Sequence, residues 1–376
     1  MQTITKEEKS DACTNFINSL DSEASRIAYR TVFPYFMKFC KIDTYDAMLL
    51  IEPKKLEGLI RDYIIHLRED RKVSSATVAA YSSAITHFFE MNDVIINWKE
   101  LKKFKGKKRQ MVEDVPYTRD QIKTMIDLAS LRDRCMILVM ASAGLRRGAL
   151  FHVRIKDLQK IDKYNLYKIT VYKKEQEQYT TFCTPEAAKY IDQYLDWRAR
   201  LGETLKPETP LFRLEYDTTD YIRIAKPRPV RPQTVSHVIT TLLDKTGIRP
   251  RTQSYHRISL MACHGFRKFF DTQCINHSMN ILYCEYLMGH KSGLIKSYFK
   301  PTDTELLEGN DKSVGYIGVI PYLTINSTEE ENERLRCQVE TLQVEKSQIE
   351  ELHKEMEEIR ELVAAKQRHQ IQKLQK

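Results

Sequence analysis

The sequence predicts a mainly α-helical protein with a small antiparallel β-sheet and a coiled-coil tail. Apolar residues recur at helical spacing over much of residues 10–98 and again after residue 117. Two short runs rich in β-branched and aromatic residues, 166–172 and 178–183, flank a polar turn and predict a hairpin. From residue 327 the chain consists almost entirely of helix-forming residues with heptad spacing.

Length and charge narrow the class of protein. The 376 residues suffice for two domains and an appended segment, at roughly 150 residues a domain. The net charge of +9 favours a polyanionic partner over a membrane. No apolar run approaches the roughly 18 residues that span a bilayer, and the N-terminus lacks the layout of a signal peptide. We therefore expect a cytoplasmic protein, associated with the nucleoid or, if viral, in the host cytoplasm.

The eight cysteines are scattered without a C-x-x-C pair, which favours free thiols in a reducing compartment. A zinc site built from Cys263, Cys274, His277, Cys284 or His290 is the weaker alternative, because paired ligand spacing is missing. The sequence therefore predicts no metal and no cofactor.

Residues 1–98 are predicted to form a small helical domain. Its clearest helix begins at Ser75, with Ser74 or Ser75 as the cap. The apolar stripe of this helix comprises Val78, Tyr81, Ile85 and Phe88. We interpret these four residues as core.

Residues 99–115 are predicted to be an extended basic linker. Seven of the eleven residues from Lys99 to Arg109 are Lys or Arg, and the intervening Phe104 and Gly106 argue against a packed element. The candidate DNA-binding residues are Lys102, Lys103, Lys105, Lys107, Lys108 and Arg109. A charge run of this kind is as often a solvated surface as a nucleic-acid contact, so both interpretations stay open.

The domain predicted over residues 116–326 begins with two helices. Thr118 and Gln121 predict a capping box for the first. The second is the apolar segment 132–143, which Gly144 ends.

Further helices follow the hairpin. Thr184-Pro185-Glu186 supplies an N-cap, a proline at the first helical position and an acidic first turn. Residues 203–232 are proline-rich and predict a loop. The remaining predicted helices cover residues 233–245, 280–288, 293–300 and 302–310.

The tail, residues 327–376, is predicted to form a coiled coil. One heptad register contains Leu335, Val339 and Leu342. The other contains Ile349, Leu352, Met356, Ile359 and Val363. The two registers differ by three residues, a stammer that overwinds a supercoil without abolishing it. An isolated charged helix is the alternative.

Residues suited to phosphodiester chemistry occur in a fixed order. They are Arg146, His264, Arg267, His290 and Tyr298. His264 and Arg267 are three residues apart, so on a helix they share one face. Arginine suits a phosphate because its planar guanidinium donates two parallel hydrogen bonds and stays charged. A tyrosine phenol, with a pKa near 10, is a poor nucleophile unless neighbouring guanidinium groups favour the phenolate.

This order of residues resembles the active site of the tyrosine recombinase and phage integrase family. The resemblance implies a helical core-binding domain followed by an α+β catalytic domain, both contacting DNA. It also implies a site-specific recombinase that cleaves and rejoins DNA strands without metal or ATP, through a covalent 3′-phosphotyrosyl intermediate on Tyr298. The implied partners are double-stranded DNA and further copies of the chain, as a dimer or tetramer on paired sites, with no membrane.

The resemblance also implies a role for each remaining residue. His264 would assist proton transfer or orient the phosphate, and His290 would donate a hydrogen bond to a nonbridging oxygen. A lysine on the hairpin turn would protonate the leaving oxygen. Lys173 and Lys174 are both candidates, and the sequence does not separate them. Ala149 stands where the family commonly has an acidic residue.

Three interpretations of the resemblance stay open. The tail favours an integrase of a mobile element or virus, archaeal sources included. The alternatives are a Xer-like resolvase of chromosome dimers and a DNA-binding relative that has lost catalysis. A metal-dependent nuclease would need clustered carboxylates, which do not occur near these residues in the sequence.

Overall fold

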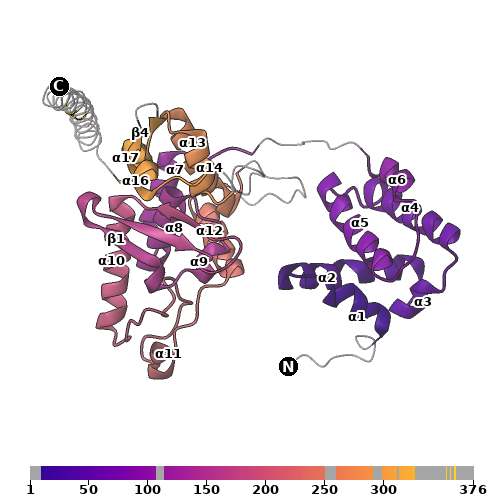
Figure 1. Ribbon diagram of the computed structural model, residues 1–376. Helices are drawn as coiled ribbons and strands as arrows, with labels where there is room; N and C mark the ends of the chain where they lie inside the picture. The colour runs from indigo at the N-terminus through magenta and orange to yellow at the C-terminus, as the bar shows by residue number, and fades with distance from the viewer. Residues whose placement is uncertain are drawn as a thin grey trace, which may run out of the picture. The chain divides into compact units, whose positions relative to one another are not determined.

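The computed structural model describes residues 10–106, 114–249, 260–290, 299–310 and 313–326, together with His353, Met356 and Arg360. The chain divides into two compact units, Met1–Met111 and Val112–Lys376, here called the N-terminal and C-terminal units. Both are mainly helical, and the C-terminal unit contains small antiparallel sheets, which confirms the predicted fold class (Figure 1). The coiled coil stays a prediction, since most of the tail lies outside the described residues.

The N-terminal unit is entirely helical in its described part. Its elements are α1 (Asp11–Asn18), α2 (Glu23–Cys40), α3 (Tyr45–Leu49), α4 (Pro53–Glu69), α5 (Ser75–Glu90), α6 (Trp98–Leu101) and the 3-10 helix η2 (Lys102–Lys105). The core is aromatic: the ring of Phe33 lies 4.2 Å from that of Phe88 and 5.1 Å from that of Phe16. Such pairs each add about 0.5–1.5 kcal/mol beyond the area they bury. Ser74 caps α5, as predicted.

The prediction of an extended basic linker is wrong for residues 99–105. Helix α6 and η2 pack against α4, and the Arg68 guanidinium donates to the Phe104 carbonyl oxygen at 2.8 Å. The reason is an apolar stripe with helical spacing, Trp98, Leu101 and Phe104, which offsets the charge of the intervening lysines. Lys102 and Lys103 are exposed and Lys105 is half-buried. The predicted contacts Lys107, Lys108 and Arg109 lie outside the described residues.

The C-terminal unit surrounds one central helix. Its helices are α7 (Arg119–Asp127), α8 (Leu131–Ala143), α9 (Ala149–His152), α10 (Pro185–Arg200), α11 (Tyr221–Ala225), α12 (Pro232–Lys245), α13 (Ala262–Asn276), α14 (Ile281–Leu287), α16 (Asp303–Glu308) and α17 (Tyr316–Leu323), with the 3-10 helices η3 (Ile155–Asp157) and η4 (Asp162–Tyr164). Almost every side chain of α8 is buried, because α10 and α13 both pack against it. The predicted capping box of Thr118 and Gln121 begins α7, and Thr184 caps α10.

A three-stranded antiparallel sheet lies beside α8 and α10 (Figure 1). Its strands are β1 (Leu158–Ile161), β2 (Leu166–Val171) and β3 (Tyr179–Phe182), in that spatial order. The predicted hairpin is β2–β3, with Val171 paired to Tyr179 on either side of the polar turn. Strand β1 was not predicted, because its four residues are half-exposed and too few to show a period.

The last described segments return to the core. Strands β4 (Gly309–Asn310) and β5 (Ser313–Val314) form a second small sheet, where the sequence predicted the end of a helix. Helix α17, also not predicted, packs against α13, and its Tyr316 hydroxyl donates to the Ser142 carbonyl oxygen at 2.7 Å. The predicted loop 203–232 contains only the short α11. Within the described part of the chain, no helix has the length and apolarity that crossing a bilayer requires.

Candidate active site

Three helical segments of the C-terminal unit bring four of the predicted site residues together: Arg146, His264, Arg267 and His290. Arg146 follows the end of α8, where Gly144 has a left-handed φ of 58° and a Cβ would stand 2.7 Å from the Phe270 ring. His264 and Arg267 lie in the first half of α13. Met288, Gly289 and His290 form the turn that ends α14. The packing of α8 against α13 therefore fixes where both arginines emerge.

Arg267 is the buried member of the site, with 4% of its surface exposed. Its Nη1 donates to the Gly144 carbonyl oxygen at 2.5 Å, and its Nη2 donates to the Met288 carbonyl oxygen at 2.6 Å. Burial, followed by the positive charge of Arg146, lowers the pKa of Arg267 to about 10. The guanidinium therefore stays charged near neutral pH and ties the end of α8 to the end of α14.

Arg146 is exposed and reaches the same turn from outside. Its Nη1 lies 3.3 Å from each of the Met288 and Gly289 carbonyl oxygens. Two guanidinium groups thus converge on the Met288 carbonyl. Like charges held this close favour an anion between them, and guanidinium donors match the oxygens of a phosphate.

Gly289 is required by the close approach of this turn to β3. Its φ is 63°, and a Cβ would stand 2.4 Å from the Tyr179 ring. Tyr179 is buried, and burial raises the pKa of its phenol to about 12 although Arg267 and Arg146 oppose the shift. Tyr179 was not predicted to belong to the site, because its contact with the turn depends on how the sheet packs.

His264 stands at the surface of α13. Its pKa is lowered by partial burial and by the positive charges of Lys268 and Arg267. The imidazole is therefore neutral near neutral pH and can accept a proton or a hydrogen bond.

His290 is held by an acidic partner that sequence reasoning did not identify. Its Nδ1 lies 2.8 Å from Glu285 Oε2, and its backbone N–H donates to the Glu285 carbonyl oxygen at 3.0 Å. A carboxylate on Nδ1 fixes the ring and leaves Nε2 for a substrate. An acidic residue one helical turn before the Gly-His pair is the signal that could have found it.

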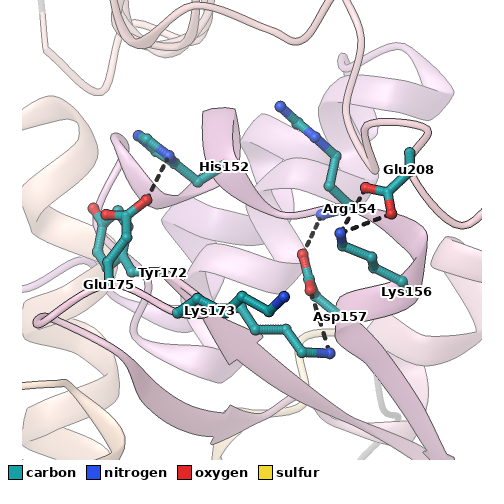
Figure 2. A pocket seen from close by; sticks show the side chains of 9 residues that line it. His152, Arg154, Lys156, Asp157, Tyr172, Lys173, Glu175 and Glu208 are labelled. Carbon is teal, nitrogen blue, oxygen red and sulfur yellow. Dashed lines mark hydrogen bonds and ion pairs between the residues drawn. The ribbon is translucent and has the colours of Figure 1, made fainter.

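The two candidate lysines lie in the β2–β3 turn, beside a pocket of about 380 Å³ (Figure 2). The pocket is lined by His152, Arg154, Lys156, Asp157, Tyr172, Lys173, Lys174, Glu175 and Glu208. Lys173 Nζ lies 3.9 Å from Asp157 Oδ1. Lys174 has a left-handed φ of 70°, and its backbone N–H donates to Gln178 Oε1 at 2.7 Å.

Neither arginine of the site lines this pocket, and Tyr172 lies between the two regions. The Tyr172 ring lies 5.1 Å from the His152 ring. Burial raises the pKa of the Tyr172 phenol, and Arg146, the next largest influence, lowers it. The structure thus brings Arg146, His264, Arg267 and His290 together. Tyr172 separates these residues from the hairpin lysines.

Two further expectations concern the nucleophile and a metal. Tyr298 lies outside the described residues. Among the residues that are described, no group of three or more His, Cys, Asp or Glu side chains could hold a metal ion. Within the suggested zinc cluster, the Cys284 thiol instead donates to Asp271 Oδ1 at 3.3 Å. Ala149, in the position that is commonly acidic in the resembling family, is fully buried.

Comparison with known proteins gives a consistent result. Residues 117–303 match the model of the phage integrase family. The chain is 22% identical over 210 residues to tyrosine recombinase XerC of Leptospira interrogans, from serovars copenhageni and Lai. This match covers 52% of the chain and spans 65% of the length of those relatives.

Solved structures share the fold at low sequence identity. The Tn1549 transposon integrase in complex with a circular intermediate DNA is 12% identical with a TM-score of 0.55, covering 78% of this chain and 96% of that one. The XerH site-specific recombinase bound to a palindromic difH substrate is 16% identical with a TM-score of 0.51, covering 75% of this chain and 78% of that one.

Proposed function

The chain belongs to the phage integrase family, and from this membership and the geometry of the site we propose that it is a tyrosine-type site-specific recombinase. It would cleave and rejoin double-stranded DNA without metal or ATP. The observation that carries the proposal is the convergence of Arg146 and Arg267 on the Met288 carbonyl. Two guanidinium groups beside a neutral histidine suit a phosphodiester, whose charge grows in the transition state.

Each residue has one task in the proposed reaction. The Tyr298 oxygen attacks the phosphorus, and the bond from phosphorus to the 5′ oxygen breaks. Arg146 and Arg267 donate to the nonbridging oxygens, and His290 donates from Nε2. His264 accepts the phenol proton, and Lys173 or Lys174 protonates the leaving 5′ oxygen. The 3′-phosphotyrosyl ester conserves the bond energy, so another strand's hydroxyl can reverse the step.

A suicide substrate tests this proposal. A nicked duplex that loses the short fragment carrying the new 5′-hydroxyl on cleavage should trap a covalent protein–DNA adduct, in EDTA as well as without it. Tyr298→Phe should retain DNA binding and form no adduct, because only the nucleophilic oxygen is removed. Tyr172→Phe is the matched control, since Tyr172 adjoins the arginines and burial raises the pKa of its phenol. An adduct in Tyr298→Phe, or its loss in EDTA, would overturn the proposal.

The N-terminal unit is proposed as the core-binding domain, residues 116–326 as the catalytic domain and Lys102, Lys103, Lys105, Lys107, Lys108 and Arg109 as phosphate contacts. The exposure of Lys102 and Lys103 supports this assignment. Each lysine that neutralises a phosphate releases a counterion and steepens the salt dependence of binding. A DNA substrate would place the protein at the nucleoid, or in the host cytoplasm if it is viral.

For the tail we propose a coiled coil that joins protomers on paired sites. Its heptad positions would otherwise leave Leu, Ile and Val side chains exposed. Deleting everything after Ser327 should leave cleavage of a single site intact and reduce self-association and the joining of two sites. Equal sedimentation and equal recombination by the full-length and truncated proteins would contradict this role. A tail of this kind favours an integrase of a mobile element over a resolvase of chromosome dimers.

A further inference from the structure

The β2–β3 turn makes two contacts at ion-pair distance, both to the segment that follows Arg146, and the one to His152 is an ion pair when the imidazole is protonated. Lys173 Nζ lies 3.9 Å from Asp157 Oδ1 on η3, and Glu175 Oε1 lies 3.7 Å from His152 Nδ1 on α9. Figure 2 shows both contacts as dashed lines. The turn that carries the two candidate lysines therefore contacts η3 and α9, beside a pocket that neither Arg146 nor Arg267 lines.

Asp157 is built differently from the other acids of this pocket. Its side chain is 5% exposed, whereas those of Glu175 and Glu208 are 49% and 73% exposed. Oδ2 accepts the Arg154 backbone N–H at 2.8 Å, which closes the turn of η3. Oδ1 is buried and accepts no hydrogen bond from the described residues, and the Lys173 ammonium lies 3.9 Å from it. A buried, unsatisfied carboxylate oxygen favours a cationic partner.

We propose that Asp157 is a positioning residue that holds Lys173 away from the arginines until DNA is bound. This inference rests on the proposed recombinase function and adds to it the identity of the lysine and the residue that restrains it. The Lys173 side chain forms an ion pair with Asp157, whereas Lys174 donates its backbone N–H to Gln178 Oε1. A DNA phosphate entering beside Arg146 competes with Asp157 for the Lys173 ammonium, because both are anions.

The released Lys173 then completes the cleavage step. As the bond between phosphorus and the 5′ oxygen breaks and the Tyr298 ester forms, the Lys173 ammonium gives its proton to the leaving oxygen and becomes the neutral amine. Asp157 touches neither the phosphate nor the leaving oxygen. Removing its charge should therefore speed only a step that waits for this proton.

A leaving group that needs no proton separates positioning from a structural role. Asp157→Asn retains an oxygen for the Arg154 N–H and removes the charge. In single turnover on ordinary DNA, it should cleave faster by up to about fivefold, the range of a partly exposed ion pair. On DNA with a bridging 5′ sulfur at the scissile bond, Asp157→Asn and the parent protein should cleave equally, because a thiolate leaves unprotonated. The charge-matched control is Glu208→Gln, which loses a pocket carboxylate that pairs with Lys156 and acts on Lys173 less strongly than on Lys156. It should change the rate on ordinary DNA by less than Asp157→Asn does and leave the rate on the sulfur substrate unchanged.

A double-mutant cycle identifies the lysine. Combined with Lys173→Gln, Asp157→Asn should no longer accelerate cleavage, whereas combined with Lys174→Gln it should still do so. The opposite pattern would show that Asp157 restrains Lys174 and not Lys173, and would overturn this part of the proposal. Slower cleavage of both substrates by Asp157→Asn, or no change on ordinary DNA, would also overturn the proposal.

A measurement that does not depend on cleavage tests the restraint of Lys173 even if Asp157→Asn folds poorly or the parent protein does not cleave DNA. Amine-directed acylation followed by peptide mass spectrometry should label Lys173 more slowly than Lys174 in the parent protein. Glu175→Gln, which removes the other ion pair at an exposed position, should narrow that difference. Equal labelling in the parent protein would overturn the restraint. Absence of cleavage on the bridging-sulfur substrate would overturn the proposed function alone.

Discussion

The candidate active site has two halves that are built in opposite ways. The arginine half comprises Arg146, Arg267, His264 and His290, and the lysine half comprises Lys173 and Lys174 in the β2–β3 turn. The arginine half lies at the edge of the core, where Arg267 bonds to the carbonyl oxygens that end α8 and α14. The lysine half is a surface turn whose two lysines are exposed, and Lys173 is held by one ion pair of 3.9 Å to Asp157. Stability and chemistry are therefore coupled at the buried Arg267 and separable at the exposed cations, Arg146 and the two lysines.

This difference follows from what each half must do. A group that stabilises developing charge works best when it is oriented in advance, which packing achieves. A group that delivers a proton must move to its acceptor, and a surface turn permits this movement at small cost. Substitutions that preserve charge should therefore affect the two halves differently.

The largest effect is expected from Arg267→Lys. A lysine cannot donate to both carbonyl oxygens from one planar group, so cleavage should fall by about 100-fold or more. The free energy of unfolding should fall by about 1–3 kcal/mol, because a buried carbonyl is left unsatisfied. Arg146→Lys should lower cleavage comparably and leave the free energy of unfolding within about 0.5 kcal/mol, since Arg146 is exposed. Suicide-substrate kinetics measure the cleavage rate, and denaturant titration measures the free energy of unfolding. Equal stability losses in the two variants would erase the contrast.

The next effect concerns the turn between the halves. Gly289→Ala must accept a left-handed φ and displace the Tyr179 ring, which a Cβ would approach to 2.4 Å. Gly247→Ala has a similar φ of 68° with no atom within 4 Å of its Cβ, so it isolates the cost of the backbone, about 1–2 kcal/mol. Thermal unfolding should show Gly289→Ala destabilised by more than this control, with cleavage reduced as well. Equal destabilisation would mean that the Tyr179 contact is loose.

The same contrast between packed and exposed cations occurs in the N-terminal unit. Lys102 and Lys103 are exposed, whereas Lys105 is half-buried, and burial followed by Lys102 lowers its pKa. Replacing Lys102 and Lys103 with Gln should lower the slope of log affinity against log salt by about 1.8, at about 0.9 for each lost phosphate contact. Replacing Lys105 alone should lower it by less. An unchanged slope in the double variant would show that η2 faces solvent away from DNA.

The sequence predicts the arginine half better than the lysine half for a physical reason. Arg146 follows a glycine that ends a helix, and His264 and Arg267 share one helical face, so local rules place them. Asp157 and Tyr179 enter the site through packing, which no local spacing reveals, whereas Glu285 could have been found by its spacing from Gly289 and His290. The charge of residues 99–105 predicts a linker, but the apolar stripe of Trp98, Leu101 and Phe104 between the lysines packs these residues against the N-terminal core.

The smallest effect is expected at His264, beside the buried arginine. Its pKa lies below the ordinary 6.5 because of partial burial, Lys268 and Arg267. Between the lowered pKa and 6.5, the unfolded chain binds more protons than the folded one. The contribution of His264 to the free energy of unfolding therefore rises with pH through this window and is complete above it. Lys268→Gln should raise the pKa of His264, because it removes a positive charge that lowers this pKa. Titration of the imidazole C–H resonance by NMR measures the pKa, with Lys123→Gln on the exposed face of α7 as the control. An unchanged pKa of His264 in Lys268→Gln would show that Lys268 does not contribute to the shift, and the loss of cleavage at acidic pH would then be independent of residue 268.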